Sequence, residues 1–88
     1  MATVLVSHEV EDVGTWLASP RREEIGKRMG WTTRTFVDPA GSNRVGLPIE
    51  VADLNASLEY LKSPSADDME AARLDGVRLE TFVMRVES

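Results

Sequence analysis

The sequence predicts an α+β domain in which four strands and two broken helices follow one another in the order β-α-β-β-α-β. Apolar and β-branched side chains mark four strand-like segments, and apolar residues recur at helical spacing in the two stretches that separate them. Residues 16–20 (WLASP) and 60–64 (YLKSP) also match each other, half a chain length apart. Each half of the 88-residue chain is therefore expected to fold as strand, broken helix and strand.

The first half begins with a strand over residues 3–10, which are rich in β-branched side chains. Asp12 is placed to cap a short helix whose apolar residues have i, i+3 and i+4 spacing, namely Val13, Trp16 and Leu17. Pro20 interrupts this helix, and a second helical segment follows until Gly30 ends it. Residues 31–38 are expected to form the second strand, because Thr, Phe and Val occur throughout them.

Residues 38–43 (DPAGSN) combine the residue types of a hairpin loop, and a third strand is expected at residues 44–51. Pro48 interrupts this strand pattern. Because proline has no N–H to donate to a neighbouring strand, the third strand is expected to lie at a sheet edge or to carry a bulge at this residue.

The second half begins with a helix that Asp53 caps and that carries leucines at i, i+4 and i+7, namely Leu54, Leu58 and Leu61. Residues 63–65 (SPS) interrupt it, and Ser65 with Asp68 forms a capping-box pattern for a last helical segment. The fourth strand is expected over residues 77–86. Two such halves joined by a hairpin build a four-stranded antiparallel sheet with both broken helices on one face, the ferredoxin-like arrangement.

The composition limits how this single domain, residues 1–88, is stabilised and what it binds. The absence of cysteine excludes disulfides and thiolate zinc sites, so a partner subunit is the expected supplement to a small core. Ten basic against 15 acidic residues give a net charge of −5, which disfavours nucleic acids and anionic membranes. The basic stretch at residues 21–28 is interrupted by two glutamates and is typical of a solvated helix face. No secretory signal or membrane span is recognised, so a cytoplasmic location is expected.

The last strand suggests that one chain is not the working unit. Its alternation places Val77, Leu79 and Val83 on one face and Phe82, Met84 and Val86 on the other. A sheet covered by helices on one face only normally has polar residues on its other face. Large apolar groups on both faces therefore predict a homodimer whose sheets pack face to face.

Several segments resemble the dimeric α/β-barrel superfamily, and within it the small stand-alone proteins described as cyclase-like or antibiotic-biosynthesis-monooxygenase-like. The segments are residues 2–10 (ATVLVSHEV) with Asp12 and Trp16, residues 43–46 (NRVG), residues 50–54 (EVADL), and residues 61–64 (LKSP) before Met69 and residues 76–77 (GV). This resemblance implies a homodimer with a cavity in each subunit between sheet and helices. It does not imply one reaction, because the superfamily includes monooxygenases, isomerases, cyclases and haem-degrading proteins. The oxygenase and haem-degrading branches carry a histidine on the second helix, whereas residues 53–75 contain none. No cofactor is therefore expected.

His8 is the only histidine, and it shares its strand face with Val4, Val6 and Val10. An imidazole on an apolar face is a candidate general acid or base, and the alternative is a core histidine that hydrogen-bonds to the backbone or to a carboxylate. Glu50 is a candidate partner that would orient the ring, and the alternative is a solvent-facing glutamate. One histidine and one glutamate lack the ligands of a metal site, so no metal is expected.

The candidate ligand-binding residues are mostly aromatic or sulfur-containing: Trp16, Met29, Trp31, Arg34, Phe36, Tyr60 and Met69. Trp16 and Tyr60 occupy equivalent places in the two halves, on helix faces that are expected to look at the sheet. Such residues line small-molecule pockets, and they also fill cores. Arg34 shares a strand face with Phe36 and is a candidate to neutralise an acidic ligand or a partner carboxylate.

Three functions remain open on these residues. The first is a homodimer that binds an apolar or aromatic small molecule between sheet and helices, with any catalysis being cofactor-free isomerisation, cyclisation or elimination through His8. The second is a non-catalytic ligand-binding or assembly domain. The third is cofactor-free oxygenation of a phenolic, polyketide-like compound, which rests on the resemblance alone.

Overall fold

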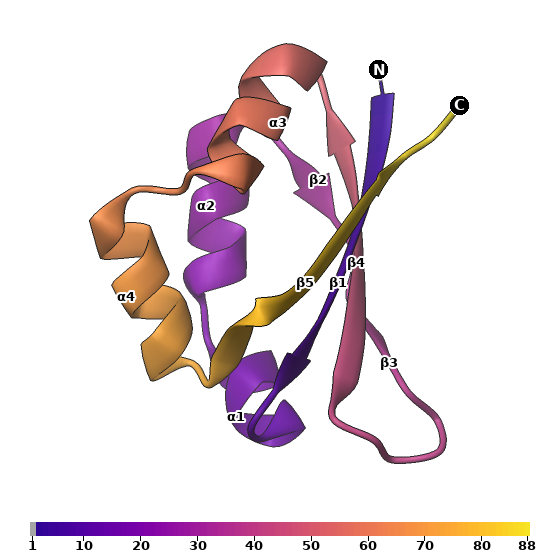
Figure 1. The fold of residues 1–88 in the computed structure, drawn as a ribbon, viewed down its shortest axis with the longest axis vertical. Coiled ribbons are helices and arrows are strands. Elements are labelled where there is room, and N and C mark those ends of the chain that lie inside the picture. The colour runs from indigo at the N-terminus through magenta and orange to yellow at the C-terminus, as the bar shows by residue number, and fades with distance from the viewer. Residues whose placement is uncertain (1) are drawn as a thin grey trace.

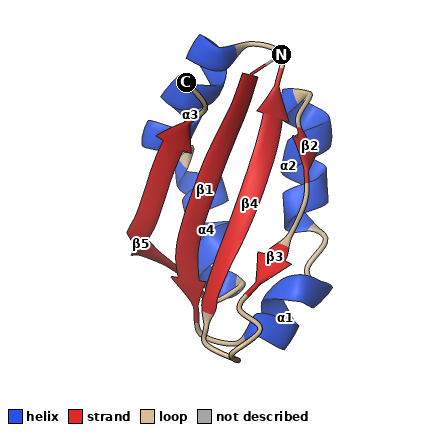
Figure 2. Ribbon diagram, turned by 90° about the vertical axis from the view of Figure 1, so that its right-hand side faces the viewer, coloured by secondary structure: helices blue, strands red, loops and turns tan. Residues whose placement is uncertain are grey.

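Four helices lie beside an open antiparallel sheet in the computed structural model, which describes residues 2–88 (Figure 1). The elements in chain order are β1 (Ala2–Val10), α1 (Val13–Ala18), α2 (Arg21–Met29), β2 (Thr32–Thr33), β3 (Phe36–Val37), β4 (Arg44–Val51), α3 (Leu54–Lys62), α4 (Ala66–Leu74) and β5 (Val77–Val86). The strands are ordered β2-β4-β1-β5, and β3 also pairs with β4. Figure 2 looks onto the sheet face that α2, α3 and α4 do not cover. No helix among the described residues has the length and apolar character needed to cross a membrane.

The prediction of one continuous second strand is wrong, because residues 31–38 form two short strands. Thr33 is paired with Ile49 in β4, and Phe36 is paired with Gly46, so Pro48 lies opposite the interruption. The Arg34 N–H donates to the Pro48 carbonyl at 3.2 Å. Because the N–H and C=O of a strand residue point to the same side, the N–H that Pro48 lacks would face this gap. The expectation that Pro48 places its strand at a sheet edge or in a bulge is wrong, because β4 is an interior strand whose pairing with β1 is regular. Pro48 instead interrupts the neighbouring strand.

The helices begin and end as the sequence pattern predicts. Asp12, Asp53 and Ser65 each accept a hydrogen bond from the backbone N–H three residues later, at 3.0–3.1 Å. Gly30 ends α2 with a φ of 74°, a conformation that favours glycine. The buried apolar core consists of one face of β1, one face of β4 and a helical tryptophan: Val4, Val6, Val10, Trp16, Val45, Leu47, Ile49 and Val51.

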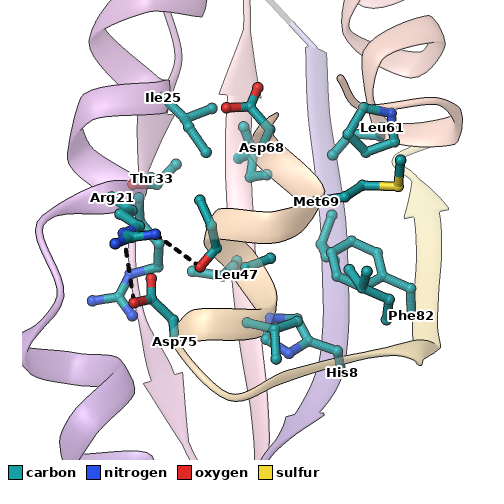
Figure 3. Close-up of a pocket in the computed structure, with 18 of the residues that line it drawn as sticks. His8, Arg21, Ile25, Thr33, Leu47, Leu61, Asp68, Met69, Asp75 and Phe82 are labelled. Atoms are coloured by element: carbon teal, nitrogen blue, oxygen red, sulfur yellow. Dashed lines mark hydrogen bonds and ion pairs between the residues drawn. The ribbon is translucent and has the colours of Figure 1, made fainter. Parts of the chain in front are cut away.

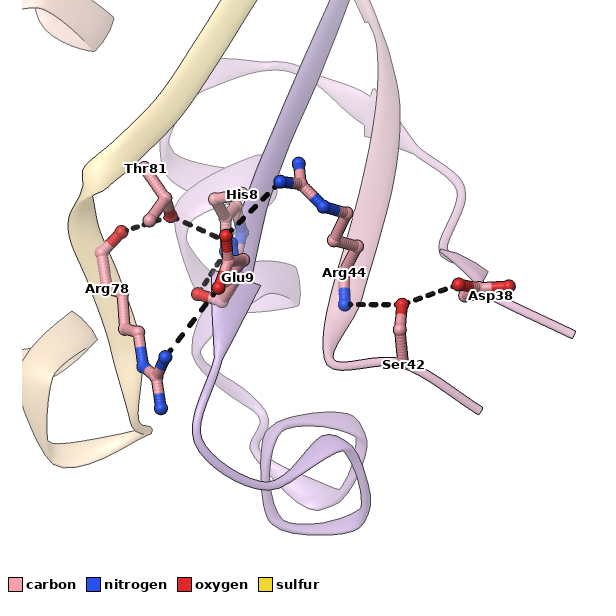
Figure 4. Close-up of polar contacts among 7 residues, drawn as sticks. All are labelled: His8, Glu9, Asp38, Ser42, Arg44, Arg78 and Thr81. Carbon is pink, nitrogen blue, oxygen red and sulfur yellow. Dashed lines mark hydrogen bonds and ion pairs between the residues drawn. The ribbon is translucent and has the colours of Figure 1, made fainter. Parts of the chain in front are cut away.

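An irregularity in the pairing of β5 with β1 changes which side chains of β5 face the helices. Val10 pairs with Val77, whereas Ser7 pairs with Val83, so the pairing register shifts between these two pairs through a β-bulge. Thr81 fills the gap with its hydroxyl, which accepts from the Glu9 N–H at 2.8 Å and donates to the Arg78 carbonyl at 2.6 Å (Figure 4).

This bulge contradicts the expected division of the last strand into two apolar faces. The helix-facing side receives Val77 and Leu79 before the bulge and Phe82, Met84 and Val86 after it. Val83 alone of the predicted apolar residues turns to the open face, where it is 40% exposed. The open face still carries apolar groups from three strands, because Leu5 in β1 is 48% exposed and Phe36 in β3 is 52% exposed.

Candidate functional site

A cavity of about 140 Å³ lies between the helix-facing side of the sheet and the helices (Figure 3). Its wall on the sheet side is formed by β1, β4 and β5, and its other walls come from α1, α2, β2 and the α3–α4 pair. Most of the lining is apolar, including Val6, Leu47, Ile49, Ile25 and Leu61. A few polar side chains reach the same space, which is the composition expected of a small-molecule site.

His8 is the buried polar group on the sheet side of this cavity, with 3% of its surface exposed. Its ring stacks on Phe82 with centroids 5.0 Å apart and meets Trp16 edge-on at 5.5 Å. Its Nδ1 lies 3.2 Å from the Glu9 carbonyl. Because a carbonyl only accepts hydrogen bonds, Nδ1 carries the proton and Nε2 keeps its lone pair.

The environment of His8 favours the neutral ring. Burial lowers its pKa below the ordinary value of 6.5, and the positive charge of Arg22 lowers it further, against an opposing effect of the hydrogen bond to Glu9. Within residues 2–88 no fully buried side-chain nitrogen or oxygen lacks a hydrogen-bond partner. Nε2 has no hydrogen-bond partner among these residues and is not one of the fully buried atoms, so it keeps an accessible lone pair.

The end of the cavity near α3 and α4 is held by a hydrogen-bonded cluster. Asp68 accepts from the Tyr60 hydroxyl and from Arg28, both at 2.5 Å. Burial, followed by the hydrogen bond to Asp68, raises the pKa of Tyr60 well above its usual value, so its hydroxyl stays protonated. The hydrogen bond from Tyr60 is the largest of the effects that lower the pKa of Asp68. This cluster is therefore a fixed neighbour of the cavity and not a proton donor at neutral pH.

Polar contacts join α2 to α4 along one wall of the cavity. Arg21 forms an ion pair with Asp75 at 3.6 Å and donates to the Ala71 carbonyl at 3.0 Å (Figure 3). The Ser19 hydroxyl also donates to Asp75, at 2.7 Å. A wider surface groove between α1, α2 and α4 lies next to the cavity and shares Arg21 and Asp75 with its lining.

Five of the nine predicted site residues line the cavity: His8, Trp16, Trp31, Tyr60 and Met69. Trp31 is oriented by a hydrogen bond from its indole nitrogen to the Ser57 hydroxyl at 2.9 Å and meets Tyr60 edge-on at 5.5 Å. Met29 is half-buried at the end of α2 and is not part of the lining. The functional roles of all these residues stay predictions.

The other three predicted residues lie on the open face of the sheet. Glu50 pairs with Thr3 and is exposed, whereas His8 points to the helices, so the expected His8–Glu50 pair does not form. The physical reason is strand alternation, which sends residues of opposite parity to opposite faces. Arg34 and Phe36 do share a face, with the guanidinium 5.5 Å from the ring, but that face is not the cavity.

Sequence reasoning missed most of the lining, including all of its charged residues and Phe82. It assigned Arg21 and Arg22 to a solvated helix face, interpreted Asp68 only as part of a helix cap, and gave no role to Asp75 or Phe82. The break at Pro20 was the available signal for the arginines, because it lets the first turn of α2 lie over the end of α1. Phe82 had no such signal, since its orientation depends on the bulge in β5.

The fold and this site together define a small α+β domain with an apolar cavity between an open antiparallel sheet and its helices. Comparisons with protein-family models, with curated proteins and with solved structures found no match. The resemblance to the dimeric α/β-barrel superfamily stays a prediction, with which a small α+β domain and an antiparallel sheet are compatible.

Proposed function

We propose that this protein binds a one-ring aromatic molecule, or an apolar molecule of similar size, in the cavity between sheet and helices. The observation that carries this proposal is a cavity of about 140 Å³ with largely apolar walls and a buried histidine. An apolar cavity of about 150 Å³ is large enough to bind benzene. The same volume favours a one-ring ligand over a multi-ring phenolic polyketide.

The chemistry that fits this site is proton transfer at Nε2 of His8. The neutral ring supplies a base, and its contacts with Trp16 and Phe82 hold the imidazole plane in one orientation. A base of this kind takes a proton from one atom of the ligand and returns it to another, which accounts for isomerisation, cyclisation or elimination without a cofactor. A non-catalytic ligand-binding domain is the alternative, and it uses the same cavity.

A cavity-filling substitution tests the binding proposal with phenol, toluene and indole as probes. Ala72 lines the cavity, so A72L is expected to abolish the rise in melting temperature that a bound probe causes. Ala56 is exposed on α3, so A56L is the matched control and is expected to keep that rise. Probe-induced stabilisation that is equal in A72L and wild type, or absent from the wild type, would contradict the proposal.

The proposed assembly is a ferredoxin-like homodimer that buries the open face of the sheet. The strand order and the location of the helices on one face support the ferredoxin-like arrangement. Leu5, Phe36 and Val83 give the open face an apolar surface, and Glu50 and Arg85 place opposite charges on the same face. Because a twofold interface brings one patch against its own copy, such a mixture of charges is self-complementary.

A further inference from the structure

The charged side chains that line the cavity are not all paired with one another. Four permanently charged side chains reach it, namely Arg21, Arg22, Asp68 and Asp75. Arg21 pairs with Asp75 at 3.6 Å, and Asp68 pairs with Arg28 outside the lining. Arg22 forms no ion pair within residues 2–88. Arg22 is therefore the one charged residue of the lining without an ion-pair partner.

Arg22 is nevertheless held in a defined position. Its guanidinium lies 3.9 Å from the centroid of the Trp16 ring, and it donates to the carbonyls of Trp16 at 3.0 Å and Leu17 at 3.4 Å. These contacts use two of its five N–H donors and leave donors for a ligand. Arg22 is half-buried, and this burial lowers its pKa. Asp75 acts on it from beyond ion-pair distance, and Asp75 is already bonded to Arg21 and Ser19.

His8 and Arg22 share Trp16 as a neighbour. His8 meets the indole edge-on, Arg22 lies over its ring, and the charge of Arg22 is felt at His8. The ring of a ligand that packs against His8 and Phe82 would therefore lie close to the half-buried, positively charged guanidinium of Arg22. A guanidinium presents its N–H donors as a planar fork. Such a fork matches a carboxylate, whose two oxygens accept parallel hydrogen bonds from a guanidinium.

We propose that the ligand of this cavity is a small aromatic carboxylate, with its ring in the apolar space and its carboxylate bound by Arg22. This inference rests on the proposed function, because it names the class of ligand that the same cavity takes. It also gives Arg22 a binding role next to the base, where it compensates the negative charge of a bound acid.

The test compares benzoate with benzamide, which has the same shape and no charge, by calorimetric titration at neutral pH. Because a charge-assisted bond to a partly buried guanidinium is stronger than a neutral one, benzoate is expected to bind wild type about tenfold more tightly. R22Q is expected to lose this preference and to keep its affinity for benzamide. R34Q removes the same charge from the open face of the sheet, and the preference is expected to persist in it.

The outcomes separate this inference from the proposed function. Equal binding of benzoate and benzamide to wild type would overturn the carboxylate assignment and leave cavity binding intact, whereas no binding of either would overturn both. A preference that persists in folded R22Q would assign the carboxylate to another residue and overturn the inference. R22Q loses the hydrogen bonds from Arg22 to α1, and it cannot be used if this loss unfolds it. The inference is then tested by the relative affinities of wild type and R22K for benzoate and benzamide. R22K keeps the charge without the fork, so it is expected to retain only part of the preference.

Discussion

At the residue scale, His8 combines burial with an open ring nitrogen. Its ring is held between two aromatic rings, and the Glu9 carbonyl is the one group among these neighbours that favours a second proton. Burial and Arg22 both disfavour the imidazolium, and the folded chain therefore holds the ring neutral. This is the state in which a histidine acts as a base, and it also makes folding sensitive to pH.

Protonation of His8 is expected to destabilise the fold. Its pKa in the folded chain lies below the unfolded value of 6.5, so the unfolded state takes up the proton first as the pH falls. The neutral ring contributes fully to the free energy of unfolding above pH 6.5. This contribution is lost as the pH falls from 6.5 toward the pKa of the folded chain. A single proton limits the slope to about 1.4 kcal/mol per pH unit.

Urea unfolding between pH 7.5 and 5 checks this expectation by comparing wild type with H8F, which keeps an aromatic ring between Trp16 and Phe82. The free energy of unfolding of wild type is expected to fall more steeply with decreasing pH than that of H8F. Parallel curves for the two proteins would show that His8 does not titrate differently in the folded and unfolded states.

At the element scale, the two outer strands show how one residue changes a ladder. Pro48 interrupts β2 and β3 because it cannot donate to Arg34, and the bulge at Thr81 reverses the alternation of β5. The first effect lies in residue chemistry and was partly visible in the sequence. The second depends on which residues of β1 and β5 pair, so the alternation of β5 alone predicted the wrong faces.

Replacing Pro48 with valine is expected to repair the interrupted ladder. The new N–H at residue 48 faces Arg34 and acquires a carbonyl acceptor there. Hydrogen exchange measures this directly, because the new amide is expected to be protected to the level of its neighbours in β4. P39V, in the exposed loop, is the control and is expected to show a rapidly exchanging new amide. Rapid exchange at residue 48 would contradict the explanation for the break.

At the scale of the whole molecule, an open sheet face remains to be accounted for. The alternation of the last strand predicted large apolar groups on both faces of the sheet. The bulge turns Phe82 and Met84 away from the open face, so this argument for a homodimer is weaker. The exposed side chains of Leu5 and Phe36 on the open face are the remaining reason to expect a homodimer. Around them a cluster of Glu9 with Arg44 and Arg78 joins three strands at one end of the face (Figure 4).

The solution mass tests this assembly. Wild type is expected to have twice the 9.7 kDa of one chain at micromolar concentration, measured by light scattering. L5D places a charge on the open face and is expected to give the mass of one chain. Leu74 is 67% exposed on α4, so L74D is the matched control and is expected to stay dimeric. A wild-type mass of one chain would exclude face-to-face pairing in solution.

Local chemistry in the sequence determined the order of strands and helices, the three helix caps and the strand face that His8 shares with Val4, Val6 and Val10. These features depend on residue type and on periods of two or 3.6 within one segment. The tertiary structure alone decided that Glu50 and Arg34 lie away from the cavity, that Phe82 lies in it, and that Arg22 is its unpaired charge. Each of these outcomes depends on pairing between segments distant in the chain, and the relative placement of such segments is not encoded in the pattern of any one of them.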